Sequence, residues 1–394
     1  MHAIILVKGN DLYMEKTVIL YRKIDSSNID LVEKRLNKEL KNHKGNVIID
    51  CDELEYISSA GLRIILKLKK DYSNIKIINC NQAVYDIFEM TGFTEIMDIN
   101  KGYRKISVDG CEVIGEGAYG IVYRIDPETI VKVYKNKDSI DEIIKERERA
   151  RKAFIMGVPT AISYDIVQVG DLFGSVFELL DAKSFAELLR DGESINKLVK
   201  ESVSILKQIH SIENFSNDLP NKKEEAIKWA EFCKDYLPKD IGNKLVKMME
   251  EIPDKNTIIH GDFHIKNIMH TKKENLLIDM ETVAVGHPIL ELACSYSIYE
   301  GFECLDPKNP EEFLGVPQEQ CRRFIDLTYN YYFDELEEQQ VEEIKKKVKI
   351  ICYTRLLRRQ IKHFGIGNKE AIPSIEFCKN YLIENVPNIE NLYF

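Results

Sequence analysis

The segment His260-Gly-Asp-Phe-His-Ile-Lys-Asn267, followed by Asp279, holds the side chains with the clearest chemistry in this sequence. A carboxylate such as Asp262 can accept a hydroxyl proton while the hydroxyl oxygen attacks phosphorus. The oxygens of Asn267 and Asp279 are hard ligands, which suits an Mg²⁺ ion that bridges phosphates. The segment therefore predicts a loop for phosphoryl transfer, with Asp262 and His260 as catalytic residues and with Asn267 and Asp279 as metal ligands.

The order of these residues supports this interpretation. The pattern H-x-D-x-x-x-x-N, then an apolar strand and an aspartate, is the order found in kinases. Leu276-Leu-Ile278 is the predicted strand, and it would carry Asp279 to the loop. A His-Gly-Asp tripeptide alone can also cap an ordinary turn, so the assignment depends on the rest of the chain.

A glycine pattern upstream predicts a nucleotide site. Gly115, Gly117, Gly120 and Val122 form the sequence G-x-G-x-x-G-x-V. Dinucleotide-binding folds use similar glycines, but in those folds the last glycine opens a helix. Here apolar and β-branched residues follow at 121–125, which predicts a hairpin that lies over phosphates.

The elements after this hairpin supply further nucleotide contacts. Lys132 lies in the next predicted strand and would reach the α- and β-phosphates, although a strand lysine is also common at an exposed edge. Ser139 begins a predicted capping box and helix, whose inner face would hold Ile143, Ala150 and Phe154. Glu146 borders that face, so we predict that it pairs with Lys132, with Glu148 as the reserve. The backbone of Glu178 and Leu180 is expected to pair with an adenine edge.

Residues from about 108 to 385 resemble the aminoglycoside and choline phosphotransferase family, which has a protein-kinase-like fold. The resemblance is carried by His260–Asn267, Ile278-Asp-Met-Glu281 and Gly286-His-Pro-Ile-Leu-Glu-Leu-Ala293. It implies that Asp262 is the catalytic base, that Asn267 and Asp279 are metal ligands, and that Glu281 belongs to the substrate site. Glu291 stands where the family usually has an aspartate that braces the catalytic loop.

This resemblance implies an α+β bilobal fold, with an N-lobe at 108–180 and a large helical C-lobe at 181–385. The expected reaction moves the γ-phosphoryl group of ATP to a hydroxyl of a small molecule. Because Asp262 and Glu281 are acidic and the net charge is −10, we expect a cationic acceptor. Two alternatives are a signalling kinase that acts on STAS or other proteins, and a nucleotide-binding pseudokinase scaffold. The charged run Arg355–Arg359 is predicted to be a solvated helix face rather than a phosphate clamp.

Residues 1–100 alternate between predicted strands and helices, which indicates an α/β domain. Asp50-Cys-Asp52 and Tyr56-Ile-Ser-Ser-Ala-Gly-Leu62 resemble the sulphate-transporter and anti-sigma-antagonist (STAS) domain. This resemblance implies that Ser59 is the position phosphorylated in the family and that the domain binds a protein partner. The family's aspartate before that serine is Ser58 here, and a structural N-cap is the alternative role for Ser59.

Composition and net charge argue against several classes of protein. The 394 residues are 44% apolar and 30% charged, which is typical of a globular protein with room for two or three domains. The acidic net charge argues against a nucleic-acid partner, and no apolar run is long enough for a membrane span. The apolar run at 4–7 is too short for a secretory signal, and the nine cysteines form no C-x-x-C pair, so we expect a cytoplasmic protein. Residues 390–394 resemble the remnant of an engineered protease tag and are left out of the fold prediction.

Overall fold

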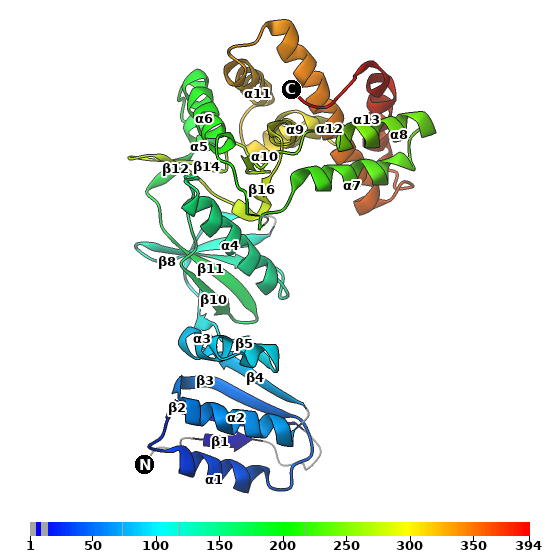
Figure 1. Cartoon of the computed structure of the whole chain (residues 1–394). Helices are drawn as coiled ribbons and strands as arrows, with labels where there is room; N and C mark the ends of the chain where they lie inside the picture. Colours follow the sequence, from blue (N-terminus) through cyan, green and yellow to red (C-terminus); the bar gives the residue numbers. More distant parts are fainter. Residues whose placement is uncertain (1–4, 9–14, 73, 118, 217) are drawn as a thin grey trace. The chain divides into compact units, whose positions relative to one another are not determined.

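The computed structural model describes residues 5–8, 15–72, 74–117, 119–216 and 218–394 (Figure 1). The chain divides into two compact units, one of residues 1–109 with 166–174 and the other of residues 110–165 with 175–394. Within the described ranges, no helix combines the length and the apolar character that a membrane crossing needs. The apolar run at 4–7 lies partly outside these ranges.

The first unit is an α/β structure built on a five-stranded sheet in the order β1-β2-β3-β4-β5. Its strands are β1 (Ile5–Lys8), β2 (Lys16–Ile24), β3 (Val47–Ile57), β4 (Ile75–Cys80) and β5 (Asp98–Lys101). β1 runs antiparallel to β2, and the pairs from β2 to β5 are parallel. Parallel neighbours need crossover connections, which are α1 (Ile29–Leu40), α2 (Ser59–Asp71) and α3 (Gln82–Met90).

The helices of this unit follow from apolar spacing and from their caps. α1 buries Val32, Leu36 and Leu40 at intervals of four residues, as one helix face requires. α3 begins after Asn81, whose side chain accepts a hydrogen bond from the backbone N–H of Val84 at 3.0 Å. The apolar faces of these helices and strands meet in one core, so the sequence pattern at 17–90 already specified this fold.

A second, six-stranded sheet has the order β6-β10-β11-β9-β8-β7. These strands are β6 (Arg104–Ile106), β7 (Glu112–Glu116), β8 (Gly120–Asp126), β9 (Thr129–Tyr134), β10 (Asp165–Val169) and β11 (Leu172–Glu178). β7, β8 and β9 form an antiparallel meander, as the glycine pattern predicted. The register pairs Val122 with Lys132, so the end of the glycine pattern and the lysine lie side by side.

The helix after β9 is α4 (Ile140–Ile155), and two details differ from the prediction. Ser139 is the N-cap residue, but its side chain makes no capping hydrogen bond, so the predicted capping box is wrong. Phe154 is 51% exposed, and Ala153 is the buried residue in its place. The inner face is thus rotated by one residue at its C-terminal end, while Ile143, Glu146 and Ala150 are buried.

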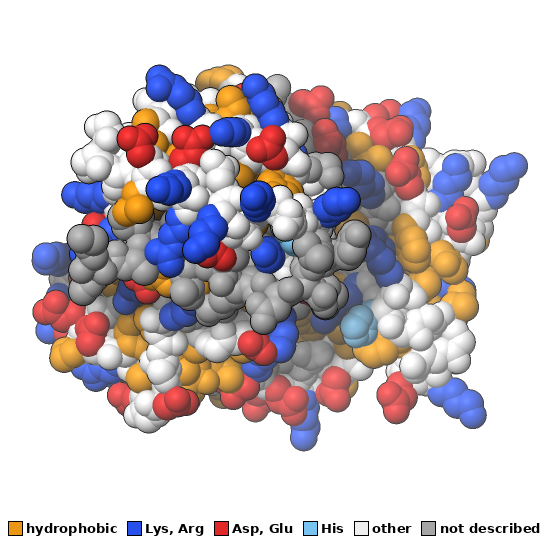
Figure 2. Space-filling view, turned by 90° about the horizontal axis from the view of Figure 1, so that it is seen from below, with side chains coloured by type: hydrophobic (Ala, Val, Ile, Leu, Met, Phe, Trp, Pro, Cys, Tyr) orange, Lys and Arg blue, Asp and Glu red, His pale blue; other side chains and the backbone are white. Residues whose placement is uncertain are grey.

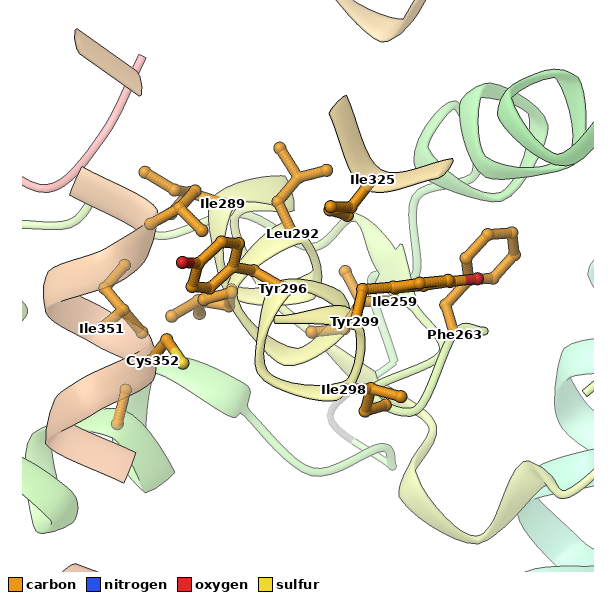
Figure 3. Close-up of a cluster of buried hydrophobic side chains, with 14 of the residues drawn as sticks. Ile259, Phe263, Ile289, Leu292, Tyr296, Ile298, Tyr299, Ile325, Ile351 and Cys352 are labelled. Atoms are coloured by element: carbon orange, nitrogen blue, oxygen red, sulfur yellow. The ribbon is translucent and has the colours of Figure 1, made fainter. Parts of the chain in front are cut away.

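The rest of the second unit is mainly helical. Its helices are α5 (Phe185–Arg190), α6 (Ile195–His210), α7 (Lys222–Lys234), α8 (Lys239–Glu250), α9 (Pro288–Tyr299), α10 (Asn309–Leu314), α11 (Gln318–Tyr332), α12 (Glu338–Phe364) and α13 (Ile372–Asn385). α9 is buried along its whole length. Figure 3 shows Tyr296 of α9 beside Ile351 and Cys352 of α12, while Tyr299 points toward Phe263 of the loop before β14. α9 is therefore the central support between the candidate loop and α12.

Two small sheets hold the candidate loop. β12 (Ala182–Ser184), β14 (Ile268–Thr271) and β15 (Asn275–Leu277) form one sheet, and β13 (Ile258–Ile259) pairs with β16 (Ala284–Val285) in the other. The segment 260–267 therefore connects one sheet to the other. Ile258 and Ile259 of β13 are buried before the loop, and Ile268 of β14 is buried after it. These residues fix the two ends of the loop.

Two regions of the helical part correct the sequence analysis. Arg355 is half-buried and hydrogen-bonded, so the prediction of a solvated face at 355–359 is wrong for this residue. The C-terminal segment, which was left out of the fold prediction, packs against the helical part. Leu392 is buried there, and Lys347 Nζ donates to Asn391 Oδ1 at 2.9 Å and to the carbonyl of Tyr393 at 2.8 Å.

Figure 2 shows one face of the molecule with acidic and basic side chains both spread over it. The net charge of −10 therefore does not gather into a single acidic field on this face. Net charge alone is weak evidence for the charge of a ligand, because local side chains dominate at short range.

Candidate active site

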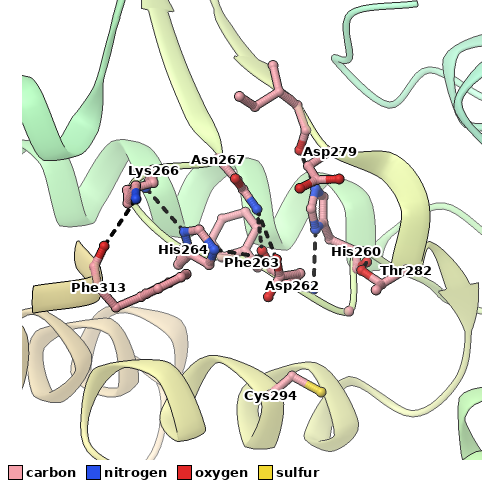
Figure 4. Close-up of polar contacts among 12 residues, drawn as sticks. His260, Asp262, Phe263, His264, Lys266, Asn267, Asp279, Thr282, Cys294 and Phe313 are labelled. Atoms are coloured by element: carbon pink, nitrogen blue, oxygen red, sulfur yellow. Dashed lines mark hydrogen bonds and ion pairs between the residues drawn. The ribbon is translucent and has the colours of Figure 1, made fainter. Parts of the chain in front are cut away.

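The hairpin of β14 and β15 brings Asn267 and Asp279 together. Ile268 pairs with Leu277, and the backbone N–H of Ile278 donates to the carbonyl of Asn267 at 3.0 Å. Asp279 then takes a left-handed conformation with φ of 64°. Such a backbone conformation is unfavourable for a residue with a Cβ and is often found at functional sites. It turns the Asp279 carboxylate toward the loop (Figure 4).

Asn267 fixes Asp262 through its side-chain amide. Asn267 Nδ2 donates to the carbonyl oxygen of Asp262 at 3.0 Å and to Asp262 Oδ2 at 3.2 Å. The Asn267 backbone N–H donates to the carbonyl of His264 at 2.8 Å, which closes the turn. Because the amide nitrogen holds Asp262, the amide oxygen is the end of Asn267 that can serve a metal ion.

His264 is a site residue that the sequence analysis missed. Its Nδ1 accepts a hydrogen bond from the backbone N–H of Lys266 at 3.3 Å, so Nε2 is the protonated nitrogen. His264 Nε2 lies 3.4 Å from Asp262 Oδ2, and the ring packs edge-on against Phe313. The available signal was a second histidine two residues after the aspartate of the motif.

These contacts keep Asp262 ionised. Burial raises the pKa of the Asp262 carboxyl, but the hydrogen bond from His264 and the electrostatic effects of His264, His260 and Arg355 lower it to about 2. The side chain is still 32% exposed, so an acceptor can reach it. Asp262 is therefore a fixed carboxylate in an accessible position.

His260 lies behind the loop rather than at its surface. Its Nδ1 accepts from the backbone N–H of Asp262 at 3.3 Å, and its Nε2 donates to the carbonyl of Ile278 at 3.1 Å. Complete burial lowers the pKa of His260 below its usual value, so the ring is neutral. With both nitrogens bound to backbone, His260 acts as a positioning residue that joins the Asp262 and Asp279 segments.

Glu291 of α9 braces the start of the loop. Its carboxylate accepts hydrogen bonds from the backbone N–H of His260 and, at 3.0 Å, from that of Gly261. Gly261 has a φ of 80°, and an added Cβ would lie 2.6 Å from the carbonyl oxygen of Thr282, so only glycine fits there. Burial raises the pKa of Glu291 to about 7 against the effect of these two N–H groups.

The nucleotide side of the site is organised by Lys132. Lys132 Nζ lies 3.3 Å from Glu146 Oε1 and 3.5 Å from Asp279 Oδ1. Tyr134 donates its hydroxyl to the other oxygen of Glu146 at 2.7 Å. Burial opposes the charge on Lys132, but Asp279 and Glu146 raise its pKa above the usual value. The structure thus pairs Lys132 with Glu146, whereas Glu148 is exposed.

The glycine hairpin leaves open space beside Lys132. An added Cβ would meet no atom closer than 3.9 Å at Gly115 and none closer than 4.0 Å at Gly117. At Gly120 an added Cβ would lie 2.7 Å from the carbonyl oxygen of Val133, so this position requires glycine for close strand packing. Residue 118, inside the predicted loop, lies outside the described residues.

The predicted adenine contact lies after β11. Glu178 is the last residue of that strand, and the next backbone N–H, of Leu179, donates to the carbonyl of Glu128 at 2.7 Å. The carbonyl of Leu180 accepts from the N–H of Ala182 at 2.9 Å in a turn. Pairing of Glu178 and Leu180 with a base stays a prediction.

Glu281 follows Asp279 by two residues, and its backbone is bound to α4. Its carbonyl accepts a hydrogen bond from the Arg149 side chain of α4. Burial and the nearby Asp279 and Glu146 carboxylates raise the pKa of the Glu281 carboxyl, while Lys132 opposes that shift. A substrate-binding role for Glu281 stays a prediction.

The donor atoms fit a metal ion that is shared with phosphates. Asp279 Oδ1 is buried and makes no hydrogen bond, and the amide of Asn267 lies beside it (Figure 4). Within the described ranges, no group of three or more His, Cys, Asp or Glu side chains could hold an ion without other ligands. Two protein oxygens that need further oxygens match the way Mg²⁺ binds with nucleotide phosphates.

The first unit holds the remaining predicted site residue, Ser59. Ser59 is exposed at the first position of α2, while Ser58 is the N-cap and accepts from the backbone N–H of Gly61 at 3.4 Å. The structural capping role therefore belongs to Ser58. The Ser59 hydroxyl is available at a helix N-terminus, where an anion is favoured.

Two family models match this chain. A family model described as the STAS domain matches residues 16–106, and one described as the phosphotransferase enzyme family matches residues 110–307. The Bordetella bronchiseptica protein named as an anti-sigma factor antagonist, BtrV, is 30% identical over 80 residues, which are 19% of this chain and 69% of that protein.

Solved structures with a similar backbone were also found. The ADP-bound aminoglycoside phosphotransferase APH(2'')-Ib is 16% identical, with a TM-score of 0.46 over 78% of this chain and 99% of its own. A choline/ethanolamine kinase family protein from Mesorhizobium loti is 13% identical, with a TM-score of 0.44 over 70% and 90% of the two chains. The phosphotransferase match covers just over half of this sequence. The chain therefore belongs to the phosphotransferase enzyme family and carries a STAS domain in front of its phosphotransferase domain.

Proposed function

We propose that this protein transfers the γ-phosphoryl group of ATP to a hydroxyl of a small molecule, with Asp262 as the proton acceptor and Lys132 as the main nucleotide contact. The observation that carries the proposal is the fixed state of Asp262. Its carboxylate is oriented by His264 and Asn267, is accessible, and lies in the same loop system as Asp279. A catalytic loop needs this preorganisation, and a purely structural turn does not.

In the proposed reaction the acceptor hydroxyl is oriented by Asp262 in line with the γ-phosphorus. The new bond joins the acceptor oxygen to phosphorus, and the bond from phosphorus to the β-phosphate oxygen breaks to release ADP. The hydroxyl proton passes to Asp262 and from there to water. Because the pKa of Asp262 is about 2, the proton moves late, when bonding to phosphorus has made the hydroxyl acidic.

Other residues support the nucleotide. Lys132, held by Glu146, would contact the α- and β-phosphates, and the open hairpin at Gly115 and Gly117 leaves room for them. Asn267 and Asp279 would hold Mg²⁺, which supplies charge neutralisation at the phosphates. Glu178 and Leu180 are proposed to pair with adenine through their backbone.

The two alternatives predict different behaviour. A pseudokinase scaffold would not need an ionised, oriented Asp262, so the contacts of this residue favour an enzyme. A signalling kinase would need a protein acceptor, and we propose that the STAS domain serves as a docking or regulatory unit for a protein partner instead of as the substrate.

The test is phosphoryl transfer from Mg-ATP across a panel of small alcohols, amino alcohols, hydroxy acids, aminoglycosides and STAS proteins. Release of ADP should depend on one small-molecule class, and phosphorus NMR should show a phosphate ester of that class. Transfer to STAS proteins alone would favour the signalling kinase. Nucleotide binding with no transfer to any acceptor would favour the scaffold.

A further inference from the structure

Two arginines of α12 lie one helical turn apart, at positions 355 and 359. Residues four apart occupy the same face of a helix, so both guanidinium groups leave α12 in the same direction. The sequence alone placed them in a solvated charged run. Arg355 is half-buried, whereas Arg359 is exposed, so only Arg355 departs from that expectation.

Arg355 is half-buried in the helical part, and its side-chain hydrogen bond goes to a hydroxyl rather than to a carboxylate. Its Nη1 donates to Ser297 Oγ of α9 at 3.1 Å, and its guanidinium lies 5.8 Å from the centre of the Trp229 ring. The ion pairs of the described residues include none with Arg355. The nearby Glu225 carboxylate is bound to Lys222 Nζ at 2.7 Å. Most donors of the Arg355 guanidinium therefore face no fixed anion.

Arg359 continues the same basic face one turn further along α12. Its guanidinium lies 5.2 Å from the centre of the Phe302 ring. Burial and the charge of Arg355 lower the pKa of Arg359, and the Tyr119 side chain of the glycine hairpin opposes this shift. Arg359 is exposed and lies one helical turn beyond Arg355 on the same face of α12.

The same face is connected to the catalytic loop through α9. Ser295 Oγ donates to the carbonyl of Phe263 at 3.0 Å, next to Asp262, and Ser297 two residues later accepts from Arg355. The charges of Asp262 and Arg355 also act on one another, since each carries a pKa shifted by the other. Arg355 and the Asp262 loop are thus connected through α9, although Asp262 and Arg355 form no direct ion pair.

This arrangement is unfavourable without a ligand. The half-buried Arg355 guanidinium has lost part of its contact with water and needs hydrogen-bond acceptors, and the exposed Arg359 adds a like charge one turn away. The Trp229 and Phe302 rings and Ser297 orient the groups but bring no negative charge. An anion with two or more oxygens would satisfy both guanidiniums, because the planar fork of arginine matches carboxylate and phosphate oxygens.

We propose that Arg355 and Arg359 bind an anionic group of the acceptor, so that the acceptor is a small hydroxy compound with a carboxylate or phosphate group. This inference rests on the proposed function, and it replaces the cationic acceptor that the sequence suggested. Binding of the anionic group at the arginines would leave the hydroxyl of the same molecule facing Asp262. The hydroxyl oxygen then forms the new bond to phosphorus, ADP leaves, and Asp262 takes the proton.

A matched acceptor series tests the charge directly. Glycerate, glycerol 3-phosphate, glycerol and 2,3-dihydroxypropyltrimethylammonium share hydroxyl groups and differ in charge. In wild-type protein with Mg-ATP, we expect kcat/KM to be highest for one of the two anionic compounds, and the better of the two identifies carboxylate or phosphate as the preferred group. Calorimetric titration of the same compounds into protein with Mg-ADP should show the same order of affinity.

Substitutions then connect this preference to the arginines. Arg355→Met and Arg359→Met should each lower affinity and kcat/KM for the anionic compound by roughly tenfold to hundredfold, so that its advantage over glycerol shrinks. Arg355→Lys keeps the charge and should restore part of that advantage. Arg323→Met, which removes an exposed arginine from α11, is the control and should leave the order unchanged. Circular dichroism identifies any variant that does not fold.

Transfer activity and calorimetric titration test the anionic acceptor and the proposed function separately. Transfer without any preference for the anionic compounds, or a preference for the ammonium compound, would overturn the anionic acceptor and leave the phosphotransferase in place. Absence of transfer to every acceptor would overturn the proposed function, and the titrations would still decide whether these arginines bind an anion. Equal binding of all four compounds, unchanged in Arg355→Met, would overturn the inference.

Discussion

Asp262 combines a low pKa with an accessible position, and this has a direct consequence for catalysis. A carboxylate with a pKa of about 2 is a weak base, so its main contribution is to orient the hydroxyl and to accept a proton late in the reaction. The group stays ionised at every pH above about 4, because the depressed pKa moves its titration below that range. An acid limit of activity at pH 5 to 6 would therefore come from another group.

The substitution Asp262→Asn should abolish transfer and keep nucleotide binding. Asparagine keeps the size of the side chain but cannot accept the proton, so we expect a loss of at least roughly 10²-fold in kcat. Titration of ATP should give a dissociation constant close to that of wild type, since Lys132 and Asp279 are unchanged. Turnover at the wild-type rate would show that this loop is not the catalytic one.

Asp279 should make nucleotide affinity depend on Mg²⁺. Its Oδ1 is buried without a hydrogen bond, and Asn267 is a neutral ligand that cannot hold the ion alone. In wild-type protein, ATP should bind more tightly with Mg²⁺ than with EDTA, and Asp279→Ala should lose most of that difference in calorimetry. Asp326→Ala changes an exposed aspartate of α11 and should keep the difference. Equal affinity with and without Mg²⁺ in wild type would support the scaffold alternative.

At the residue scale, the sequence predicted a shared site better for residues that are close along the chain than for residues that are distant. Asp262, Asn267 and Asp279 fall within one motif and one hairpin, so their spacing already implied a shared site. Lys132 and Glu146 could be paired because helical spacing placed only one glutamate on the inner face. Arg355 lies about ninety residues after the loop, and only the packing of α12 against α9 brings it there.

At the scale of elements, α9 sets the position of the loop through Glu291. The carboxylate is fully buried and accepts backbone N–H groups from the first two residues of the loop. Its pKa rises from an ordinary value of 4.5 to about 7. In this pH range the folded protein binds more protons than the unfolded chain, so stability decreases as pH rises from about 4.5 to about 7.

The substitution Glu291→Gln should remove this pH dependence. Between about pH 4.5 and about pH 7, the free energy of unfolding of the wild-type phosphotransferase unit decreases because Glu291 loses its proton. In the variant this decrease should be smaller by up to about 3 kcal/mol. Fluorescence of Trp229, the single tryptophan of the chain, reports denaturant unfolding of this unit. The variant should also lose activity, because glutamine offers one acceptor oxygen to two N–H groups. Glu250→Gln, at an exposed site of α8, is the control, and an unchanged slope in Glu291→Gln would contradict the raised pKa.

The helices show which elements a sequence pattern can describe. α1 and α3 have one buried face and polar residues elsewhere, so their spacing gave both bounds and orientation. α12 buries consecutive residues from Ile350 to Thr354, so it has apolar neighbours on several sides. A helix that is buried on several sides gives no periodic signal for its solvent face. The predicted solvated face of α12 is wrong for Arg355 for this reason, whereas Arg359 is exposed as predicted.

At the scale of the whole molecule, the division into a STAS and a phosphotransferase part followed from composition and motifs. The polar segment at 101–109 was the predicted boundary, and the two family matches end at 106 and begin at 110. The assignment of residues 166–174 to the first unit has no local signal, because those residues continue an ordinary hairpin pattern. Assignments of this kind depend on tertiary packing.

The position of Ser59 leads to a prediction about self-phosphorylation. Phosphoryl transfer needs the acceptor oxygen about 3–3.5 Å from the γ-phosphorus, which an extended and adaptable segment can provide. Ser59 is the first residue of a folded helix, fixed by the Ser58 cap and by buried Leu62 and Ile65 in the next turn. We therefore expect no stoichiometric mass increase in intact-mass spectrometry after incubation of the full chain with Mg-ATP.

The exposed Ser59 hydroxyl is still open to modification by a separate kinase. Incubation with Mg-ATP alone distinguishes that case from phosphorylation by the protein itself. Purified protein with Mg-ATP alone should keep its mass in wild type, in Ser59→Ala and in the control Ser27→Ala, which changes another exposed serine of the same unit. A gain of one phosphate per chain that is absent in Ser59→Ala and in Asp262→Asn, but present in Ser27→Ala, would show that the phosphotransferase domain acts on the STAS domain. The helix start at Ser59 would then have to open during the reaction, and hydrogen exchange at residues 59–62 would become faster in the presence of Mg-ATP. The rigid cap of α2 predicts the opposite, a mass and an exchange rate that ATP does not change.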